Sequence, residues 1–337
     1  LDITEDADIL EEIARIYGYD NIPSATLEGN ATAGVKTEKQ KFIDDIKFNS
    51  IAVGLNEILT YSFVSPRGVD KINLAQDDER REFVKIINPL GEETSVMRTT
   101  LIPNMIDVIS TNLSHKVEEA YAFECGNTFK PQEGLPVETK KMSIGMYGKD
   151  VDFFTLKGAV ETILNNVGFK GYEIEPETKN LTFHPGRCAK LVYNNICIGT
   201  FGELHPDVLE NYDLNQRVYI AEINVDLVFE NLNNAKVYNP LPKYPSTTRD
   251  IALLVKDEVF VKQIEDIIKA NGEDILESYQ LFDVYKGAQI EEGHKSIAYS
   301  ITYRSKDKTL TDEEVAKVHD KIVSELSEKL NANLRSN

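Results

Sequence analysis

The sequence predicts an α+β protein, in which a mostly antiparallel sheet with flanking helices is followed by a small ferredoxin-like domain. Its 337 residues are many for one compact core, which favours two or more domains. Between residues 36 and 229, segments with helical periodicity alternate with segments typical of strands. The proline-rich segment YNPLPKYPSTT at 238–248 then breaks the pattern and marks a boundary. Beyond it, the candidate elements follow the order β-α-β-β-α-β of a ferredoxin-like domain.

The larger part is expected to begin with a helix over 36–54 and a strand over EILTYSFVSP at 57–66, where side chains alternate in type. A strand and turn follow in VKIINPLG at 84–91, and a helix begins after Pro103. The sequence CAKLVYNNICIGTFGEL predicts a hairpin that turns at Asn194 and Asn195, because asparagine tolerates a positive φ. The other expected elements are strands at 120–129, 142–148 and 217–229 and a helix at 154–167.

The smaller part is expected to contain strands at 249–255, 275–285 and 295–303, with helices at 260–270 and 312–331. Thr311 and Glu314 have the spacing of a capping box at the start of the last helix. The segment NANLR is expected to add a short final strand. These elements complete the β-α-β-β-α-β order.

The composition is that of an ordinary globular protein, with 41% hydrophobic and 28% charged residues. We find no apolar run long enough to span a bilayer and no secretory leader, so we expect a cytoplasmic protein without membrane contact. Three cysteines argue against a disulfide framework. Because the chain begins at Leu1 rather than at a methionine, we expect it to be a piece of a longer protein.

The net charge of −19 argues against nonspecific binding to nucleic acid, which favours a basic surface. This charge is unevenly distributed. From Lys236 onward the sequence has 15 basic and 18 acidic residues, so almost all of the excess negative charge belongs to the first 235 residues. The C-terminal third is therefore the better candidate for contact with a phosphate backbone.

The first twelve positions contain six acidic residues and run into a helical stripe formed by Ile9, Ile13, Ile16 and Tyr17. Beside this stripe, three carboxylates have i, i+3 and i+4 spacing, and a fourth lies just upstream: Asp8, Glu11, Glu12 and Asp2. Oxygen ligands of this kind suit Mg²⁺. Acidic residues near a helix N-terminus also suit the helix dipole and simply face solvent. The spacing alone favours the solvated interpretation.

Several segments resemble bacterial phenylalanyl-tRNA synthetase β subunits, specifically their C-terminal part, over essentially the whole chain. The opening "DI…D…EE.AR.YGY.NIP" is similar to the end of the domain that precedes the core of these subunits. NPLGEETSVMRTTLIPNM, AFECGNTF and HPGRCAKL…IGTFGELHP resemble the class II synthetase-like core. KYPSTTRDIALLV and YRSKDKTLTDEEV resemble the ferredoxin-fold anticodon-binding domain. The resemblance thus implies three parts: residues 1–30, a core at 31–235 and an anticodon-binding domain at 236–337.

The resemblance also changes the interpretation of the acidic cluster. In this family the matching carboxylates bind Mg²⁺ at a site shared with the α subunit, and the pattern transfers to Asp2, Asp8, Glu11 and Glu12. We therefore expect a metal site here, with the solvated surface as the alternative. An isolated fragment would lack any ligand that a partner supplies.

The core is expected to be non-catalytic. A competent class II synthetase carries an arginine–glutamate pair and a glycine-rich motif ending in arginine, which hold ATP. Arg98 in SVMRTTL is not followed by the acidic partner, and we find no nucleotide-binding loop. The resemblance implies an (αβ)₂ heterotetramer, in which the α subunit uses ATP to charge tRNA(Phe) with phenylalanine. This chain would organise the α subunit and be inactive alone.

The anticodon-binding domain is slightly acidic, but single-stranded RNA is recognised by a few placed aromatic and basic side chains. The candidates on the expected strands and loop are Arg249, Tyr285, Arg304, Lys306 and Lys308. For each one, a structural role is an equal alternative, and Tyr303 is a candidate for the core. A different function for the whole chain also stays open, namely a stand-alone module that binds other RNA or protein partners.

A zinc site at His184, Cys188, Cys197 and His205 is disfavoured by the hairpin register. Cys197 is expected to face Val192, four residues from Cys188 along the strand. At about 3.3 Å per residue the two thiols would lie about 13 Å apart, too far for one metal ion or a disulfide. We expect both cysteines to be buried structural residues.

Overall fold

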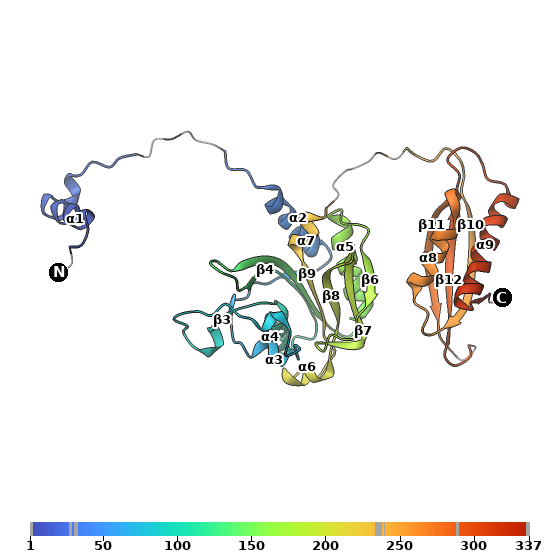
Figure 1. The fold of residues 1–337 in the computed structure, drawn as a ribbon, viewed down its shortest axis with the longest axis horizontal. Coiled ribbons are helices and arrows are strands. Elements are labelled where there is room, and N and C mark those ends of the chain that lie inside the picture. The colour runs from blue at the N-terminus through green and yellow to red at the C-terminus, as the bar shows by residue number, and fades with distance from the viewer. Residues whose placement is uncertain are drawn as a thin grey trace. The chain divides into compact units, whose positions relative to one another are not determined.

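The computed structural model describes residues 3–26, 29, 33–232, 238, 240–287 and 290–334. The chain divides into two compact units, Leu1–Ala235 and Lys236–Asn337 (Figure 1). Within the described ranges, no helix is both long and apolar enough to cross a membrane.

The first unit is built on a seven-stranded sheet with strand order β1-β4-β5-β9-β8-β7-β6. All neighbours in it are antiparallel except β1 and β4. Its strands are β1 (Asn56–Glu57), β4 (Ala120–Lys130), β5 (Val137–Tyr147), β6 (Glu173–Pro176), β7 (Phe183–Tyr193), β8 (Ile196–Leu204) and β9 (Tyr219–Asn224). A separate pair is formed by β2 (Phe63–Val64) and β3 (Val96–Met97).

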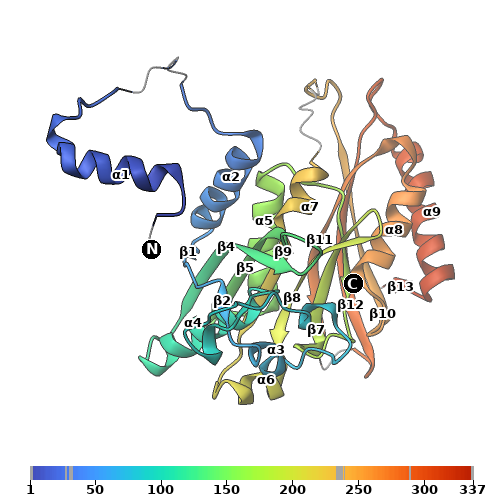
Figure 2. The same cartoon turned by 60° about the vertical axis from the view of Figure 1, so that its left-hand side comes forward.

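Helices cover both faces of this sheet (Figures 1 and 2). On one face, a core cluster joins the sheet to α2 (Glu38–Ala52), α5 (Phe153–Asn166) and α7 (Val225–Glu230). On the other face, a second cluster joins it to α3 (Gly68–Lys71), α4 (Ile102–Ser114) and α6 (Pro206–Asn211). Helix α4 approaches β5 so closely that a Cβ on Gly145 would lie 2.6 Å from the Met105 side chain. The second face therefore needs a residue without a side chain at this position.

The second unit is a four-stranded antiparallel sheet, order β11-β12-β10-β13, with two helices packed on one face. Its elements are β10 (Thr247–Lys256), α8 (Val261–Asn271), β11 (Leu276–Tyr285), β12 (His294–Tyr303), α9 (Asp312–Leu330) and β13 (Asn333–Leu334). The predicted β-α-β-β-α-β order is confirmed. The predicted capping box is confirmed too, since the Thr311 hydroxyl accepts from the Glu314 amide and the Glu314 carboxylate accepts from the Thr311 amide.

The predicted strand over 57–66 is wrong. It is two short strands, β1 and β2, and the residues between them are not paired in a sheet. Thr60 explains the interruption, because its hydroxyl donates to a Glu124 carboxylate oxygen over 2.6 Å rather than facing outward from a regular strand. The alternating pattern is present, but the pairing of β1 with β4 stops at Glu57, and Thr60 instead bonds to β4 through its side chain.

The predicted strand over 217–229 is also wrong at its end. Strand β9 stops at Asn224, and residues from Val225 onward form α7. The Asn224 side chain accepts from the Leu227 amide over 3.0 Å and so caps the helix. The strand predicted at 142–148 begins earlier, at Val137, because it forms the whole second arm of the hairpin with β4.

The N-terminal segment contains α1 (Asp6–Tyr17), which agrees with the predicted helical stripe. None of its residues is buried, and Ile9, Ile13 and Ile16 are all exposed. The apolar stripe is thus present but is not covered by the described residues.

Candidate functional site

The acidic side chains of α1 bond mainly to groups of the same segment. One Asp8 carboxylate oxygen accepts from the Thr4 amide over 2.7 Å and from the Glu5 amide over 2.9 Å. These two bonds hold the pKa of Asp8 below its usual value. Glu12 accepts from the Arg15 guanidinium, and this bond and charge lower the pKa of Glu12. Glu11 is exposed on the same helix.

These carboxylates do not gather around one point in the structure. No group of three or more His, Cys, Asp or Glu side chains that could hold a metal ion is found in the described ranges. Asp2, the fourth expected ligand, lies outside the described residues. The Mg²⁺ site therefore stays a prediction, and no chemical step is assigned to a metal.

A buried ion pair joins two segments that are distant in sequence. Arg98, at the end of β3, donates from Nη1 to the Glu124 carboxylate of β4 over 2.8 Å. Arg98 Nε also donates to the carbonyl of Asn127 over 2.9 Å, and Nη1 donates to the Thr60 hydroxyl over 2.8 Å. A Cβ on Gly126 would lie 2.2 Å from the guanidinium. Arg98 is thus held within the fold by a carboxylate from a distant strand, a structural pair distinct from the ATP-holding motif considered in the sequence.

A second buried carboxylate lies two strands away on the same face. Glu222 of β9 accepts from the Thr100 hydroxyl over 2.6 Å, from the Leu101 amide over 2.7 Å and from Lys141 Nζ of β5 over 2.9 Å. Burial acts to raise the pKa of Glu222, but the Lys141 charge and these hydrogen bonds lower it more. Sequence reasoning missed both glutamates. Each was visible only as a single acid within an apolar strand.

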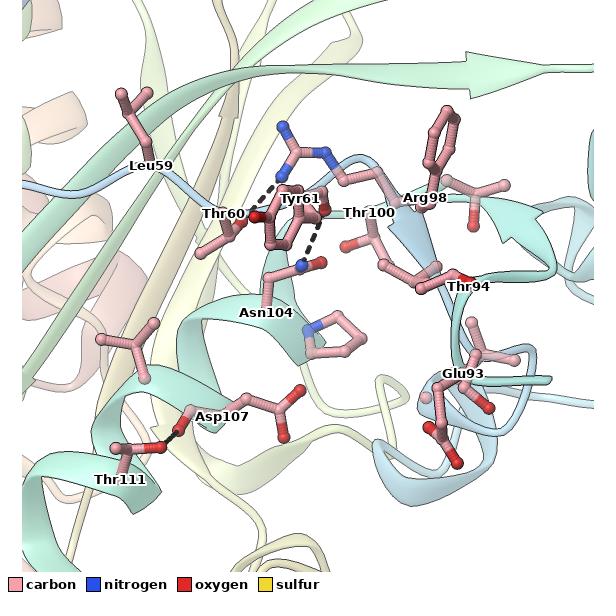
Figure 3. Close-up of a pocket in the computed structure, with 18 of the residues that line it drawn as sticks. Leu59, Thr60, Tyr61, Glu93, Thr94, Arg98, Thr100, Asn104, Asp107 and Thr111 are labelled. Carbon is pink, nitrogen blue, oxygen red and sulfur yellow. Dashed lines mark hydrogen bonds between the residues drawn. The ribbon is translucent and has the colours of Figure 1, made fainter. Parts of the chain in front are cut away.

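A hollow of about 510 Å³, the α4 pocket, opens between α4, the segment 59–65 and the turn at 92–94 (Figure 3). Its lining is mainly apolar and includes Tyr61, Phe63 and Phe83. Asp107 of α4 and Glu93 of the turn lie on opposite walls. Burial and the nearby Glu93 charge raise the pKa of Asp107, against the opposing effect of Lys71. No sequence motif indicated this pocket.

The candidate RNA-binding residues of the second unit do not share one face. Arg249 of β10 pairs in register with the buried Ile301, so it points to the face covered by the helices. There Arg249 Nη2 lies 3.1 Å from the Asp312 carboxylate in the first turn of α9. Tyr285 of β11 pairs in register with Ser296, which lies on the opposite face.

Arg304 makes structural contacts, which agrees with the structural alternative left open for it. Its Nε donates to the Glu277 carboxylate over 2.9 Å, and its Nη1 donates to the carbonyl of Tyr244 over 2.6 Å. Arg304 therefore fastens the segment before β10 to the sheet. Lys308 pairs with Glu314 of α9, and Lys306 is exposed in the same loop.

The predicted core role of Tyr303 is confirmed. Its side chain is completely buried, and its hydroxyl lies 3.0 Å from Nδ1 of His319. Burial raises the pKa of Tyr303 to about 12 and lowers that of His319.

The predicted hairpin register is confirmed, since Cys197 faces Val192 and Asn194 and Asn195 both have positive φ. Cys188 is buried, and burial raises the pKa of its thiol to about 12. Cys197 is exposed, so the expectation that both cysteines are buried is wrong for this residue.

Two family models match the chain. The phenylalanyl tRNA synthetase beta chain CLM domain matches residues 22–225. This chain belongs to the phenylalanyl-tRNA synthetase β-chain family. The ferredoxin-fold anticodon binding domain matches residues 242–335. The resemblance found in the sequence motifs is thus confirmed, as is the ferredoxin fold of the second unit.

Curated relatives in the phenylalanyl-tRNA synthetase β-chain family are similar over almost the whole chain. The phenylalanine–tRNA ligase beta subunits of Clostridium tetani and Clostridium acetobutylicum are 48% and 45% identical over 99% of this chain. That of Listeria monocytogenes is 40% identical over 99% of it. The matched region is 42% of each relative, so the chain spans less than half of their length.

A solved structure of a pyrrolysyl tRNA synthetase from Desulfitobacterium hafniense is also similar. It is 10% identical, with a TM-score of 0.47 over 56% of this chain and 66% of that one. A likeness of this size supports no inference about the core of a β-chain family member.

Proposed function

We propose that this chain is the non-catalytic C-terminal portion of a phenylalanyl-tRNA synthetase β subunit. In this role it organises the α subunit, which charges tRNA(Phe) with phenylalanine using ATP in the cytoplasm, and it binds the tRNA anticodon. The observation that carries the proposal is the order of the two family matches, one on each compact unit. The alternative of a stand-alone module has no comparable support.

We further propose that the first unit is a class II synthetase-like core that has lost its chemistry. An antiparallel sheet with helices on both faces agrees with this proposal. Two basic side chains on the α4 face are already paired, Arg98 with Glu124 and Lys141 with Glu222. A cation held by a buried carboxylate is poorly placed to neutralise a triphosphate, because binding would have to break an existing pair.

The exposed apolar side chains of the first unit favour the proposal that it binds a protein partner. Large apolar side chains are strongly exposed near the α4 pocket, among them Tyr61 at 86%, and others lie on α2. The exposed members of these two groups are Leu59, Tyr61, Ile87, Leu90, Phe48 and Ile51. The two groups are separate, because α2 and α4 pack on opposite faces of the sheet. Clustered exposed apolar side chains are typical of a protein interface. We assign the group beside the α4 pocket to the α subunit, within an (αβ)₂ heterotetramer.

The proposal predicts that the chain co-purifies with a bacterial phenylalanyl-tRNA synthetase α subunit but is inactive alone. The measurement is phenylalanine-dependent pyrophosphate exchange, made on the chain alone and on the co-expressed pair. We expect no exchange above background for the chain alone. Exchange in preparations free of α subunit would overturn the non-catalytic assignment, and failure to co-purify would overturn the partner.

A second prediction concerns the tRNA. Arg249, Lys306 and Lys308 lie at or near the start of α9, and we propose that they contact the anticodon region. Arg249→Ala should weaken binding of tRNA(Phe) by about five- to hundredfold, the usual effect of losing a stacking or charged contact. Folding should survive, since the Asp312 partner of Arg249 is highly exposed.

Two controls make this result specific. Lys321→Ala removes an equal charge from α9, at an exposed pair with Glu273, and should change the affinity little. With tRNA whose anticodon bases are replaced, the native chain should already bind weakly, and Arg249→Ala should weaken that binding little further. Equal losses on both tRNAs would mean that Arg249 does not read the anticodon. Arg304→Ala should instead lower stability, because Arg304 anchors Tyr244 and Glu277.

A third prediction tests the acidic cluster. We propose that Asp8 and Glu11, together with Asp2 and Glu12, bind Mg²⁺ in the assembled enzyme. Asp8→Asn combined with Glu11→Gln should weaken Mg²⁺ binding more than about tenfold, since even outer-shell changes cost this much. Asparagine retains an oxygen for the Thr4 and Glu5 amides, so the helix start is preserved. Calorimetric titration measures the affinity. An unchanged value would restore the solvated interpretation.

A further inference from the structure

Among the described residues, the α4 pocket presents three side-chain acceptors without a bonded donor, namely the solvent-exposed carboxylates of Asp107 and Glu93 and one buried amide oxygen. In the part of the chain that the structure describes, neither Asp107 nor Glu93 has an ion-pair partner, although the charge of Lys71 acts on Asp107. The third acceptor is Asn104 Oδ1, which is completely buried and accepts no hydrogen bond, while the Nδ2 of the same amide donates to the carbonyl of Tyr61 over 3.1 Å. Figure 3 shows Asn104 and Asp107 along the same side of α4. A buried acceptor without a donor is costly, so a ligand that supplies N–H groups would be favoured.

The charges around the pocket favour a cation. Arg98 lines the pocket, but its charge is neutralised by the buried Glu124. Lys71 affects Asp107, but it is not part of the lining, and its ammonium lies 4.8 Å from the centre of the Tyr212 ring. The pocket therefore has two carboxylates that are not balanced by a cation in its own wall.

The rest of the lining is apolar and aromatic. Tyr61, Phe63 and Phe83 contribute rings, and Val64, Val69 and Pro103 contribute aliphatic surface. A fitting side chain must combine a long apolar stem with a cationic head that has several donors. Arginine meets these requirements better than lysine, because its planar guanidinium bonds several acceptors at once, stacks on aromatic rings and is more weakly hydrated.

We propose that the α4 pocket receives an arginine side chain of the partner synthetase subunit. This inference rests on the proposed function for the identity of the partner. The exposed apolar side chains beside the pocket, Leu59 and Tyr61, would surround the arginine at the interface. Arginine in a pocket ringed by apolar contacts is a common source of binding energy between proteins.

The first experiment uses a capped arginine, N-acetyl-arginine N-methylamide, titrated into the full chain. The methyl NMR signals of Val64, Val69 and Val108, which line the pocket, report binding. Capped citrulline has the same shape without the charge, and capped lysine has the charge without the planar fork. We expect capped arginine to bind at least about fivefold more tightly than either, which corresponds to one exposed charge contact. Equal binding of the three probes, or no binding of capped arginine, would overturn the inference.

Matched variants locate the effect. Asp107→Asn and Glu93→Gln should each weaken capped arginine about fivefold. Glu92→Gln is the control, because Glu92 is adjacent in sequence but does not line the pocket. If Glu93→Gln changes the affinity for capped arginine no more than Glu92→Gln does, the pocket does not recognise the guanidinium charge.

The partner is tested in the assembled complex. Asp107→Asn combined with Glu93→Gln should weaken association with the α subunit about tenfold, whereas Glu92→Gln should not. Association that the double variant leaves unchanged would refute the α subunit as the source of the arginine. Failure of the unsubstituted chain to associate with the α subunit would instead refute the proposed function, independently of whether capped arginine binds the pocket.

Discussion

Replacing Glu124 by glutamine is expected to lower the free energy of unfolding of the first unit by about 3–5 kcal/mol, the usual cost of breaking a buried ion pair from one side. Glu124 is 1% exposed, and the substitution leaves the Arg98 guanidinium buried without a carboxylate. Glutamine retains the shape of the side chain, so the loss reports charge rather than volume. Urea denaturation followed by far-UV circular dichroism measures it, because the chain has no tryptophan.

The same pair predicts a partial recovery in the double variant. Arg98→Met with Glu124→Gln removes the uncompensated buried charge, which is the main cost of breaking the pair from one side. The double variant should therefore be more stable than Glu124→Gln alone. Glu79→Gln is the control, since its pair with Lys130 is exposed and should contribute at most about 1 kcal/mol. A loss at Glu124 no larger than at Glu79 would mean that the buried pair does not stabilise the fold.

The regular elements could be predicted because their signals are local. The periodicity of residues 36–54 and 154–167 predicted α2 and α5, and capping residues at Thr37 and Asp152 fix where these helices begin. The hairpin turn at Asn194 and Asn195 was likewise encoded in two adjacent residues. Where a local signal was ignored, the prediction failed: Asn224 is a good helix cap, and it ended the strand expected over 217–229.

The pairs that organise the α4 face could not be predicted from local signals. Arg98 and Glu124 are 26 residues apart, and Lys141 and Glu222 are 81 residues apart. Lys141 and Glu222 meet because β5 and β9 are neighbours, with Lys141 in register with Asn224, two residues from Glu222. Arg98 reaches Glu124 because its backbone lies beside β4, where its carbonyl accepts from the Phe129 amide. A sequence pattern gives the face of each strand but not which strands are neighbours.

The pH dependence of stability offers the sharpest test of the second pair. The folded pKa of Glu222 is lowered, because the charge of Lys141 and the bonds from Thr100 and Leu101 outweigh burial. A carboxyl whose folded pKa lies below its unfolded value adds stability above the unfolded value, near pH 4.5. This contribution is lost as the pH falls through the folded pKa. The native chain should therefore lose stability below about pH 4.5 partly through Glu222.

Two substitutions at this pair are expected to change that profile, each with a stability loss that is largest at pH 7 and smaller in acid. Glu222→Gln should cost about 3 kcal/mol at pH 7, and the difference from the native chain should shrink as the pH falls below 4.5, because protonation removes the same charge from the native carboxyl. Lys141→Met leaves a buried carboxylate without its cation, so burial should then raise the folded pKa of Glu222. The stability of Lys141→Met should therefore fall furthest below that of the native chain at pH 7. On acidification this difference should shrink, since protonation of Glu222 neutralises the unpaired charge. Thr100→Val removes one bond to Glu222 and should fall between the native chain and the two charge variants. Unfolding free energies at pH 7, 5 and 3.5 decide the matter: differences that do not change with pH would mean that Glu222 stabilises the fold by packing rather than by its charge.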